Sequence, residues 1–341
     1  MAYSTIPKSS SYFNTKLYTG DASSSNAITG VGFQPDWTWI KGRNIAESHR
    51  LYDAVRGASN YVTANSSGAQ SSSIPLTSFN ADGFTIGTND DSVNGSYNYA
   101  SMNWKANGLG SSNSDGTITS TYTSANTTSG FSIVTYTGNG TGGATVGHGL
   151  GVAPKVVMVK SVGAAQDWRV YHSELGSTAS LILNTSGPSN SDVWNNTDPT
   201  SSVFSLGTNS NVNSNSATYV AYCFAEIEGF SKFGFYLGNG NDDGVFIYTG
   251  FKPAFLIVKN SSITDNWSMF NNKALGYNTF NQIMYPDLAL TESNGLPIDF
   301  LSNGFKWRTA AGMANGDGNN HIYMAFGQPI VSTNDDIATA F

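Results

Sequence analysis

Charged residues are scarce in this 341-residue chain, and cysteine is almost absent. Asp, Glu, Lys and Arg make up 11% of the sequence, against about 25% in ordinary globular domains. Solubility must therefore come from Ser, Thr, Asn and Gly, a surface more typical of extracellular β proteins than of cytosolic enzymes. The single cysteine, Cys223, cannot form an intramolecular disulfide and stands in an apolar run, so we expect it to be buried and the fold to lack disulfide bonds.

Basic runs and long apolar runs are missing too. The chain has 16 Lys and Arg against 23 Asp and Glu, a net charge of −7, which disfavours a nucleic-acid-binding face. No apolar run approaches the ~18 residues of a membrane-spanning helix. The first ten residues lack the apolar core of a signal peptide, so we expect synthesis in a cytoplasm and no membrane insertion.

The residue patterns of common catalytic and metal sites are also missing. None of the four histidines stands in a metal-ligand spacing, and one cysteine cannot make a cysteine zinc site. No nucleophile elbow or phosphate-binding loop occurs. Glu226 and Glu228 share one face of a strand end, but neither recurs elsewhere in the chain, so we interpret them as solvated carboxylates rather than a glycosidase pair. We therefore expect a protein that is not an enzyme and has no cofactor.

An internal repeat is the main positive feature of the sequence. In three segments a proline stands six residues before a lysine, with an apolar stretch between them: Pro35 and Lys41, Pro154 and Lys160, and Pro253 and Lys259. Other markers recur in the same order. They are Tyr-Thr-Gly at Tyr18, Tyr136 and Tyr248, an aromatic ring or imidazole eight residues after each lysine at His49, Trp168 and Trp267, and a closing aromatic segment at 97–104, 218–224 and 321–326. These markers indicate three degenerate copies of one unit.

Low-complexity joints suggest where the copies begin and end. We expect an N-terminal arm at 1–11, a first repeat at 12–108, a Gly/Ser/Thr/Asn-rich linker at 109–129 and a second repeat at 130–229. A second linker at 230–243, a third repeat at 244–329 and a C-terminal tail at 330–341 follow. The third copy looks trimmed, because Tyr248 leads almost directly to Pro253.

The repeat markers have the composition of strands. The segments after Pro154 and Pro253 are short continuous apolar runs, typical of strands buried on both faces, and residues 219–224 alternate with period two. Asp-Gly and Asn-Gly turn signals separate such segments. The fold class predicted is all-β, with three tandem antiparallel β-sandwiches of lectin-like or jelly-roll type.

Aromatic loop residues are the candidates for ligand binding. Flat rings among Asn, Asp and Thr suit sugars, and Trp194 and Tyr277 stand between the repeat markers. Residues 239–244 partly match a calcium-binding loop, with Asn241 and Asp243 as candidate ligands, but the glutamate required at position twelve is replaced by Gly250. An Asx-type turn explains this segment equally, so we predict no metal site.

The chain resembles repeat-containing structural and tail-fibre-like proteins of tailed bacteriophages, especially marine and cyanobacterial ones. The resemblance covers nearly the whole chain and is carried by these residues: Phe33, Pro35 and Trp37, Lys41, Asp82-Gly83-Phe84, Val93-Asn94-Gly95, Asp167-Trp168 with Tyr171, and Tyr219–Phe224. It implies a location on the virion surface and a lectin-like sandwich, and it carries no site residues.

Three functions agree with these expectations to different degrees. The leading hypothesis is a tail-fibre or spike adhesin that contacts a host surface glycan or receptor without catalysis. A capsid decoration protein is the alternative, because the long heptad or β-helical stalk of a fibre is missing. A glycan depolymerase is a second alternative that lacks an acid/base pair. The polar, weakly charged surface suits lateral packing, so we expect a homo-oligomer, a trimer, in contact with other virion proteins.

Overall fold

The computed structural model describes residues 6, 8–73, 75–87, 89–187 and 193–329. Strands dominate this part of the chain. Its α-helices, α1 (Ser210–Asn213) and α2 (Gly312–Asn315), have four residues each, and the 3-10 turn η1 (Ser9–Ser11) has three. No helix within these ranges is long and apolar enough to cross a membrane. The prediction of an all-β fold is confirmed.

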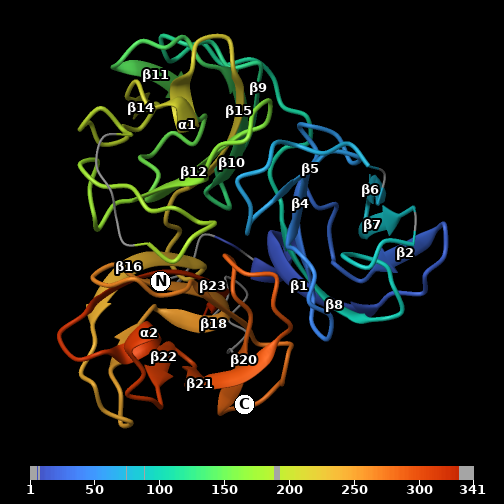
Figure 1. Cartoon of the computed structure of the whole chain (residues 1–341), viewed down its shortest axis with the longest axis vertical. Helices are drawn as coiled ribbons and strands as arrows, with labels where there is room; N and C mark the ends of the chain where they lie inside the picture. The colour runs from blue at the N-terminus through green and yellow to red at the C-terminus, as the bar shows by residue number, and fades with distance from the viewer. Residues whose placement is uncertain (1–5, 7, 74, 88, 188–192, 330–341) are drawn as a thin grey trace.

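Three lobes lie around a common centre (Figure 1), and each contains a larger antiparallel sheet. In the first lobe its order is β1 (Phe13–Thr19), β8 (Asn98–Trp104), β3 (Trp37–Gly42), β4 (Arg50–Asp53) and β5 (Tyr61–Thr63). In the second lobe the order is β9 (Tyr122–Asn126), β10 (Phe131–Thr137), β15 (Thr218–Phe224), β12 (Val156–Ser161) and β13 (Arg169–His172). In the third lobe it is β16 (Ser231–Leu237), β23 (Asn320–Pro329), β18 (Phe251–Asn260) and β19 (Ser268–Asn271). The central order is the same each time: opening strand, closing strand, lysine-bearing strand and the strand after it.

A smaller sheet covers one face of each larger sheet. The smaller sheets are β2 (Asn26–Thr29), β7 (Gly83–Ile86) and β6 (Leu76–Asn80); β11 (Ala144–Gly147) and β14 (Val203–Leu206); and β17 (Phe246–Tyr248), β22 (Gly304–Trp307), β21 (Ser293–Leu301) and β20 (Phe280–Ile283). Apolar side chains of both sheets form a separate core in each lobe. Each lobe is therefore a β-sandwich.

The other face of each larger sheet points to the centre of the molecule. A shared core forms there from all three lobes, including Trp37 and Trp104 of the first, Phe224 of the second and Phe255 and Phe326 of the third. Ring contacts cross every boundary: Trp37 stacks on Tyr222, Phe13 stacks on Phe326, and Phe224 meets Phe326 edge-on. Burial on both faces explains why these strands are continuously apolar rather than alternating. Each fully buried aromatic side chain contributes about 1.5–3 kcal/mol.

Polar contacts at equivalent positions close the three lobes into a ring. The Trp168 indole donates to the carbonyl of Thr63 in the first lobe, and the Trp267 indole donates to the carbonyl of Ile182 in the second. His49, which stands at the same place in the first lobe, contacts the carbonyl of Tyr285 in the third. The three carbonyls are at equivalent positions, because the side chain two residues after each one accepts from the backbone N–H of the repeat marker in its own lobe. Asn65 accepts from His49, Asn184 from Trp168 and Asp287 from Trp267.

A buried ion pair adds to the first boundary. Asp53 and Arg56 pair at 2.5 Å, both almost completely buried, and the Tyr222 hydroxyl of the second lobe lies 2.7 Å from the Asp53 carboxylate. Removing one partner of such a pair leaves an uncompensated buried charge. The network therefore holds the first two lobes in one relative position.

The expected boundaries of the repeats require correction. The segment 109–129 contains β9, which pairs with β10, and Ile118, which is buried; it is part of the second sandwich rather than a linker. The segment 230–243 contains β16, the opening strand of the third sandwich. Thr, Ser and Asn weaken the hydrophobic signal of β9, and the Gly/Asn-rich residues that follow β16 gave its segment the composition of a linker. Both strands are held by main-chain pairing with a neighbour.

The third Tyr-Thr-Gly marker, at Tyr248, is not the structural counterpart of the first two. Tyr18 and Tyr136 stack on Tyr99 and Tyr219 and donate to carbonyls across the lobe, and Tyr236 does the same with His321 and Ala314. Tyr236 is therefore the structural counterpart of Tyr18 and Tyr136, and the third copy is not trimmed at its start. Tyr248, placed in that role by its sequence, ends β17 and is exposed.

Candidate functional site

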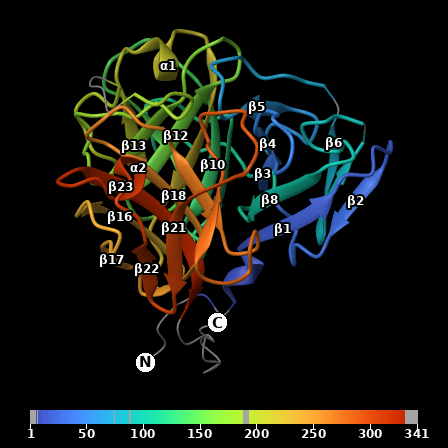
Figure 2. The same ribbon diagram turned by 60° about the horizontal axis from the view of Figure 1, so that its bottom comes forward.

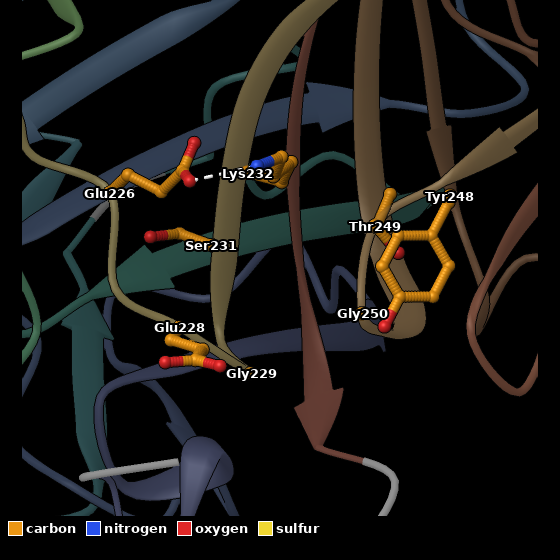
Figure 3. A pocket seen from close by; sticks show the side chains of 8 residues that line it. All are labelled: Glu226, Glu228, Gly229, Ser231, Lys232, Tyr248, Thr249 and Gly250. Atoms are coloured by element: carbon orange, nitrogen blue, oxygen red, sulfur yellow. Dashed lines mark hydrogen bonds and ion pairs between the residues drawn. The ribbon is translucent and has the colours of Figure 1, made fainter. Parts of the chain in front are cut away.

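A polar cleft of about 280 Å³ lies at the junction of the second and third lobes (Figure 3). The turn between β15 and β16 supplies Glu226, Glu228 and Gly229, the start of β16 supplies Ser231 and Lys232, and the end of β17 supplies Tyr248 with the following Thr249 and Gly250. It therefore brings the two glutamates noted in the sequence together with a tyrosine from a distant segment.

The two carboxylates have different surroundings. Glu226 accepts from Lys232 Nζ at 2.9 Å and from the backbone N–H of Phe233 at 3.3 Å. Glu228 is exposed, and its carboxylate has no hydrogen bond or ion pair within the described residues. Figure 3 shows Glu226 turned toward Lys232, with the Glu228 carboxylate apart from that pair. Glu228 is thus available to accept hydrogen bonds from a ligand.

The hydroxyl groups of the cleft are engaged by the backbone. Ser231 is buried and bonds to Ile227 N–H and the Ala225 carbonyl, while Thr249 donates to the Phe251 carbonyl at 2.6 Å. Neither hydroxyl has a histidine among these partners to serve as a base for nucleophilic attack. The cleft presents hydrogen-bonding side chains at its surface.

Tyr248 gives the cleft an aromatic surface. Its side chain is 61% exposed, because β17 is an outer strand that turns Ile247 inward and its two neighbours outward. A flat exposed ring beside a carboxylate can stack on the apolar face of a sugar while the carboxylate accepts from its hydroxyls. In the sequence, Tyr248 has the Tyr-Thr-Gly pattern of a repeat marker, and this pattern does not show that its ring is exposed at a cleft.

The two loop aromatics expected to bind a ligand have different positions. Trp194 is only 2% exposed and packs edge-on against Tyr171 in the core of the second sandwich, so the prediction that it presents its ring to a sugar is wrong. The polar residues on either side of Trp194 in the sequence suggest an exposed loop and give no indication that its ring points into the core. Tyr277 is 63% exposed and lies outside the cleft.

The candidate calcium ligands Asn241 and Asp243 lie in a turn whose surroundings are unfavourable for binding a cation. Asn241 accepts from the backbone N–H of Asp243 in an Asx turn, and the Asp243 carboxylate meets Lys306 Nζ at 3.0 Å and Arg308 at 3.4 Å. Two cationic groups beside this carboxylate repel a metal ion. No cluster of three His, Cys, Asp or Glu side chains suited to a metal occurs within the described ranges.

The three repeat lysines are structural. Lys41, Lys160 and Lys259 are completely buried, and each ammonium donates to the carbonyl of the next residue and to a carbonyl in the following loop. Lys160 and Lys259 also reach Ser67 and Ser186 in the preceding lobe. Burial lowers the pKa of each of these lysines to about 8. Lys160 and Lys259 therefore join their lobes to the preceding one, whereas the bonds of Lys41 stay within the first lobe.

Buried histidines occupy two of the lobe boundaries. Burial, followed by the charge of Lys41, lowers the pKa of His49 to about 3, and burial lowers the pKa of His172 to about 4. His172 Nε2 lies 3.2 Å from the carbonyl of Tyr323 in the third lobe. Both side chains join lobes as neutral imidazoles.

Comparison with known proteins adds a family to these observations. No curated protein and no solved structure matches the chain. Residues 8–329 match the family described as Domain of unknown function (DUF7483), a span that includes all three lobes. The chain therefore belongs to the DUF7483 family.

Proposed function

We propose that this protein is a non-catalytic adhesin on the surface of a bacteriophage particle, of tail-fibre or spike type, that binds a host surface glycan in the cleft between its second and third lobes. The phage assignment rests on the resemblance of the repeat markers. The binding assignment rests on the cleft.

The single observation that supports glycan binding is the pairing of the exposed Tyr248 ring with the available Glu228 carboxylate. Sugars offer hydroxyl donors and a weakly polar ring face, and this pair matches both. The hydroxyls of Ser231 and Thr249 are held by the backbone, which favours binding over chemistry.

Such a site binds weakly by itself. One shallow site with one aromatic platform corresponds to roughly millimolar affinity, about −4 kcal/mol. Several copies held on one particle raise avidity by ~10²–10⁴ without a new contact. Because the net charge is −7, attachment to anionic envelopes cannot depend on electrostatic attraction. Binding should persist at high salt.

The test displays the protein multivalently on beads over an array of bacterial capsular and lipopolysaccharide glycans, at about 0.05 and about 0.5 M NaCl. We expect salt-resistant binding that falls at least about tenfold in Tyr248→Ala and weakens in Glu228→Gln, since a lost factor of ten corresponds to about 1.4 kcal/mol.

Phe246→Ala is the matched control, because Phe246 is exposed on the same strand but does not line the cleft. Tyr277→Ala tests the loop position expected from the sequence. Binding that disappears only in Tyr277→Ala would move the site to that loop. Absence of binding to every glycan and to intact host cells would refute the adhesin proposal.

A capsid decoration role is the second candidate, favoured by the closed ring. The three lobes share a buried central core and a buried ion pair, which makes one compact body suited to a lattice position. Immunogold labelling of particles distinguishes the two functions: label over the head supports decoration, and label at the tail tip supports attachment.

A further inference from the structure

A second polar cleft lies at the seam between the first and third lobes, which Figure 2 draws in blue and in orange and red. It has a volume of about 430 Å³ and shares no lining residue with the cleft between the second and third lobes. Its lining comes from the segment after β3, the start of β8 and the segment before β21: Arg43, Asn44, Asn98, Thr291 and Glu292. We call it the seam cleft.

Arg43 and Glu292 join the two lobes at the seam cleft. The Glu292 N–H donates to the Arg43 carbonyl at 2.7 Å, and Arg43 Nε and Nη2 meet Glu292 Oε2 at 2.9 and 2.7 Å. Arg43 Nη2 also donates to the Ala274 carbonyl and to Gln282 Oε1 of the third lobe. These bonds fix the guanidinium and the carboxylate in place, and the two opposite charges largely cancel.

The other oxygen of the Glu292 carboxylate lacks a hydrogen-bond donor. The Glu292 side chain is only 8% exposed, yet its Oε1 has no partner within the described residues. Buried polar groups of native proteins almost always have a partner, and an unsatisfied charged acceptor is costly. A ligand in the seam cleft can supply the missing donor.

The first lobe contributes nitrogen donors to the same cleft. Asn44 Oδ1 accepts from the Asn98 backbone N–H at 2.8 Å, and Asn98 Oδ1 accepts from the Thr19 hydroxyl at 3.0 Å. Because both amide oxygens are engaged, each Nδ2 group is oriented and left to donate. Neither Nδ2 group has an acceptor in the described part of the chain, and the same holds for Arg43 Nη1. The seam cleft thus offers three donors beside one acceptor.

The charges of the cleft favour a neutral ligand group. Arg43 opposes a metal cation, and Glu292 opposes a carboxylate or a phosphate. A secondary amide is neutral and carries a carbonyl acceptor and an N–H donor that point in opposite directions from one rigid plane. The donors of Asn44 and Asn98 belong to the first lobe and the Glu292 acceptor to the third, so such an amide can bond to both sides of the seam. A hydroxyl group carries its donor and acceptor on one atom and spans less.

We propose that the seam cleft binds the acetamido group of an N-acetylated amino sugar. The carbonyl of this group accepts from the Nδ2 groups of Asn44 and Asn98, and its N–H donates to Glu292 Oε1. The choice of a glycan as ligand rests on the adhesin proposal, which the seam cleft deepens by naming a class of sugar and adding a second site.

Ligand-observed NMR titration of the full chain tests the site with two probes. They are the trimer of N-acetylglucosamine and the equally linked trimer of glucose, which has a hydroxyl in place of each acetamido group. We expect roughly millimolar binding of the acetylated trimer and at least about tenfold weaker binding of the glucose trimer. Equal binding of the two trimers overturns the proposal. Absence of binding to the acetylated trimer also overturns it, and leaves the glycan-array test of the adhesin proposal unaffected.

Substitutions at the two asparagines locate the site. Asn44→Asp and Asn98→Asp keep the engaged oxygen and replace the donating nitrogen by an acceptor, so each should weaken binding of the acetylated trimer at least about tenfold. Asn98→Ala removes one donor without adding a charge and should also weaken binding. Asn139→Asp is the matched control, because it adds the same charge at an exposed asparagine of the second lobe.

Thermal unfolding of each variant shows whether the fold is kept. Wild-type affinity in folded Asn44→Asp and Asn98→Asp overturns the seam-cleft site. Loss of binding in Tyr248→Ala alone also overturns it, and assigns the acetylated sugar to the cleft between the second and third lobes.

Discussion

His49 should make the closure of the ring sensitive to acid. The Trp39 indole can only donate, so His49 Nδ1 accepts from it at 2.8 Å, and the proton of the neutral ring is on Nε2, 2.9 Å from the Tyr285 carbonyl. A second proton would have to replace the accepting lone pair of Nδ1. Burial, followed by the charge of Lys41, lowers the pKa of His49 to about 3 against the ordinary 6.5, and the bond accepted from Trp39 opposes a second proton in the same direction.

The sign and size of the effect follow from linkage. Because the unfolded chain binds a proton at about pH 6.5 and the folded chain does not until about pH 3, the unfolded state gains protons between these values. Stability from this group is complete above pH 6.5 and is lost as the pH falls, by about 1.4 kcal/mol per unit. At pH 4.5 the expected loss from His49 is about 2.7 kcal/mol.

The assay is urea denaturation of the wild type and His49→Gln at pH 7.5, 6.5, 5.5 and 4.5. Glutamine can keep an amide donor near Tyr285, and other titrating groups cancel in the difference between the two proteins. We expect His49→Gln to be less stable at pH 7.5 and the gap to narrow or reverse by pH 4.5. The difference in stability between the wild type and His172→Gln should also narrow as the pH falls. The pKa of His172 is shifted less than that of His49, to about 4, so this effect should be complete near pH 4. Parallel stability curves for wild type and His49→Gln would refute the reasoning, as would an NMR titration of His49 near pH 6.5.

Two further changes test the contacts that unite the lobes. Lys160→Ala should destabilise the fold by about 2–5 kcal/mol, because it opens a cavity and leaves three carbonyls without a donor. Lys160→Met preserves the side-chain volume and should therefore destabilise it less. Urea denaturation at pH 7.5 measures both variants, and equal losses of stability would contradict the role of the cavity. Asp53→Ala should lower the free energy of unfolding by about 3–5 kcal/mol, since Arg56 is then buried without its partner. Asp243→Ala removes an exposed carboxylate and should change thermal stability little. A small effect of Asp53→Ala would contradict this reasoning, because it would mean that the network relaxes without loss of stability.

Local chemistry determined several features from the sequence alone. The apolar runs after Pro154 and Pro253 predicted strands buried on both faces, and β12 and the apolar part of β18 are buried along their length. The spacing of Lys41, Lys160 and Lys259 located one equivalent position in each larger sheet, and each lysine is the second-to-last residue of its strand. These features depend on residues close together in the chain, where side-chain type decides which faces are buried.

The sequence could not locate strands held by their neighbours. β9 is rich in Thr and Ser and has no strong hydrophobic pattern. β16 contains four large apolar residues, but the Gly/Asn-rich residues 238–244 that follow it gave the whole segment the composition of a linker. Main-chain pairing with β10 and β23 holds them in place. For the same reason the Tyr-Thr-Gly pattern pointed to Tyr248 instead of Tyr236, because the pattern indicates a local conformation and does not indicate which residue the ring contacts.

The tertiary structure alone decided where the second face of each larger sheet goes and which polar groups meet. The apolar composition indicates that Trp37 and Phe326 must be buried, but not that they are buried against the other lobes. Likewise, nothing near Trp194 in the sequence indicates that Tyr171 packs against it. The cleft, too, depends on Glu228 and Tyr248, which different strands bring together at a boundary between lobes. Local sequence determines which side chains must leave water, whereas the long-range pairing of strands determines what they meet there.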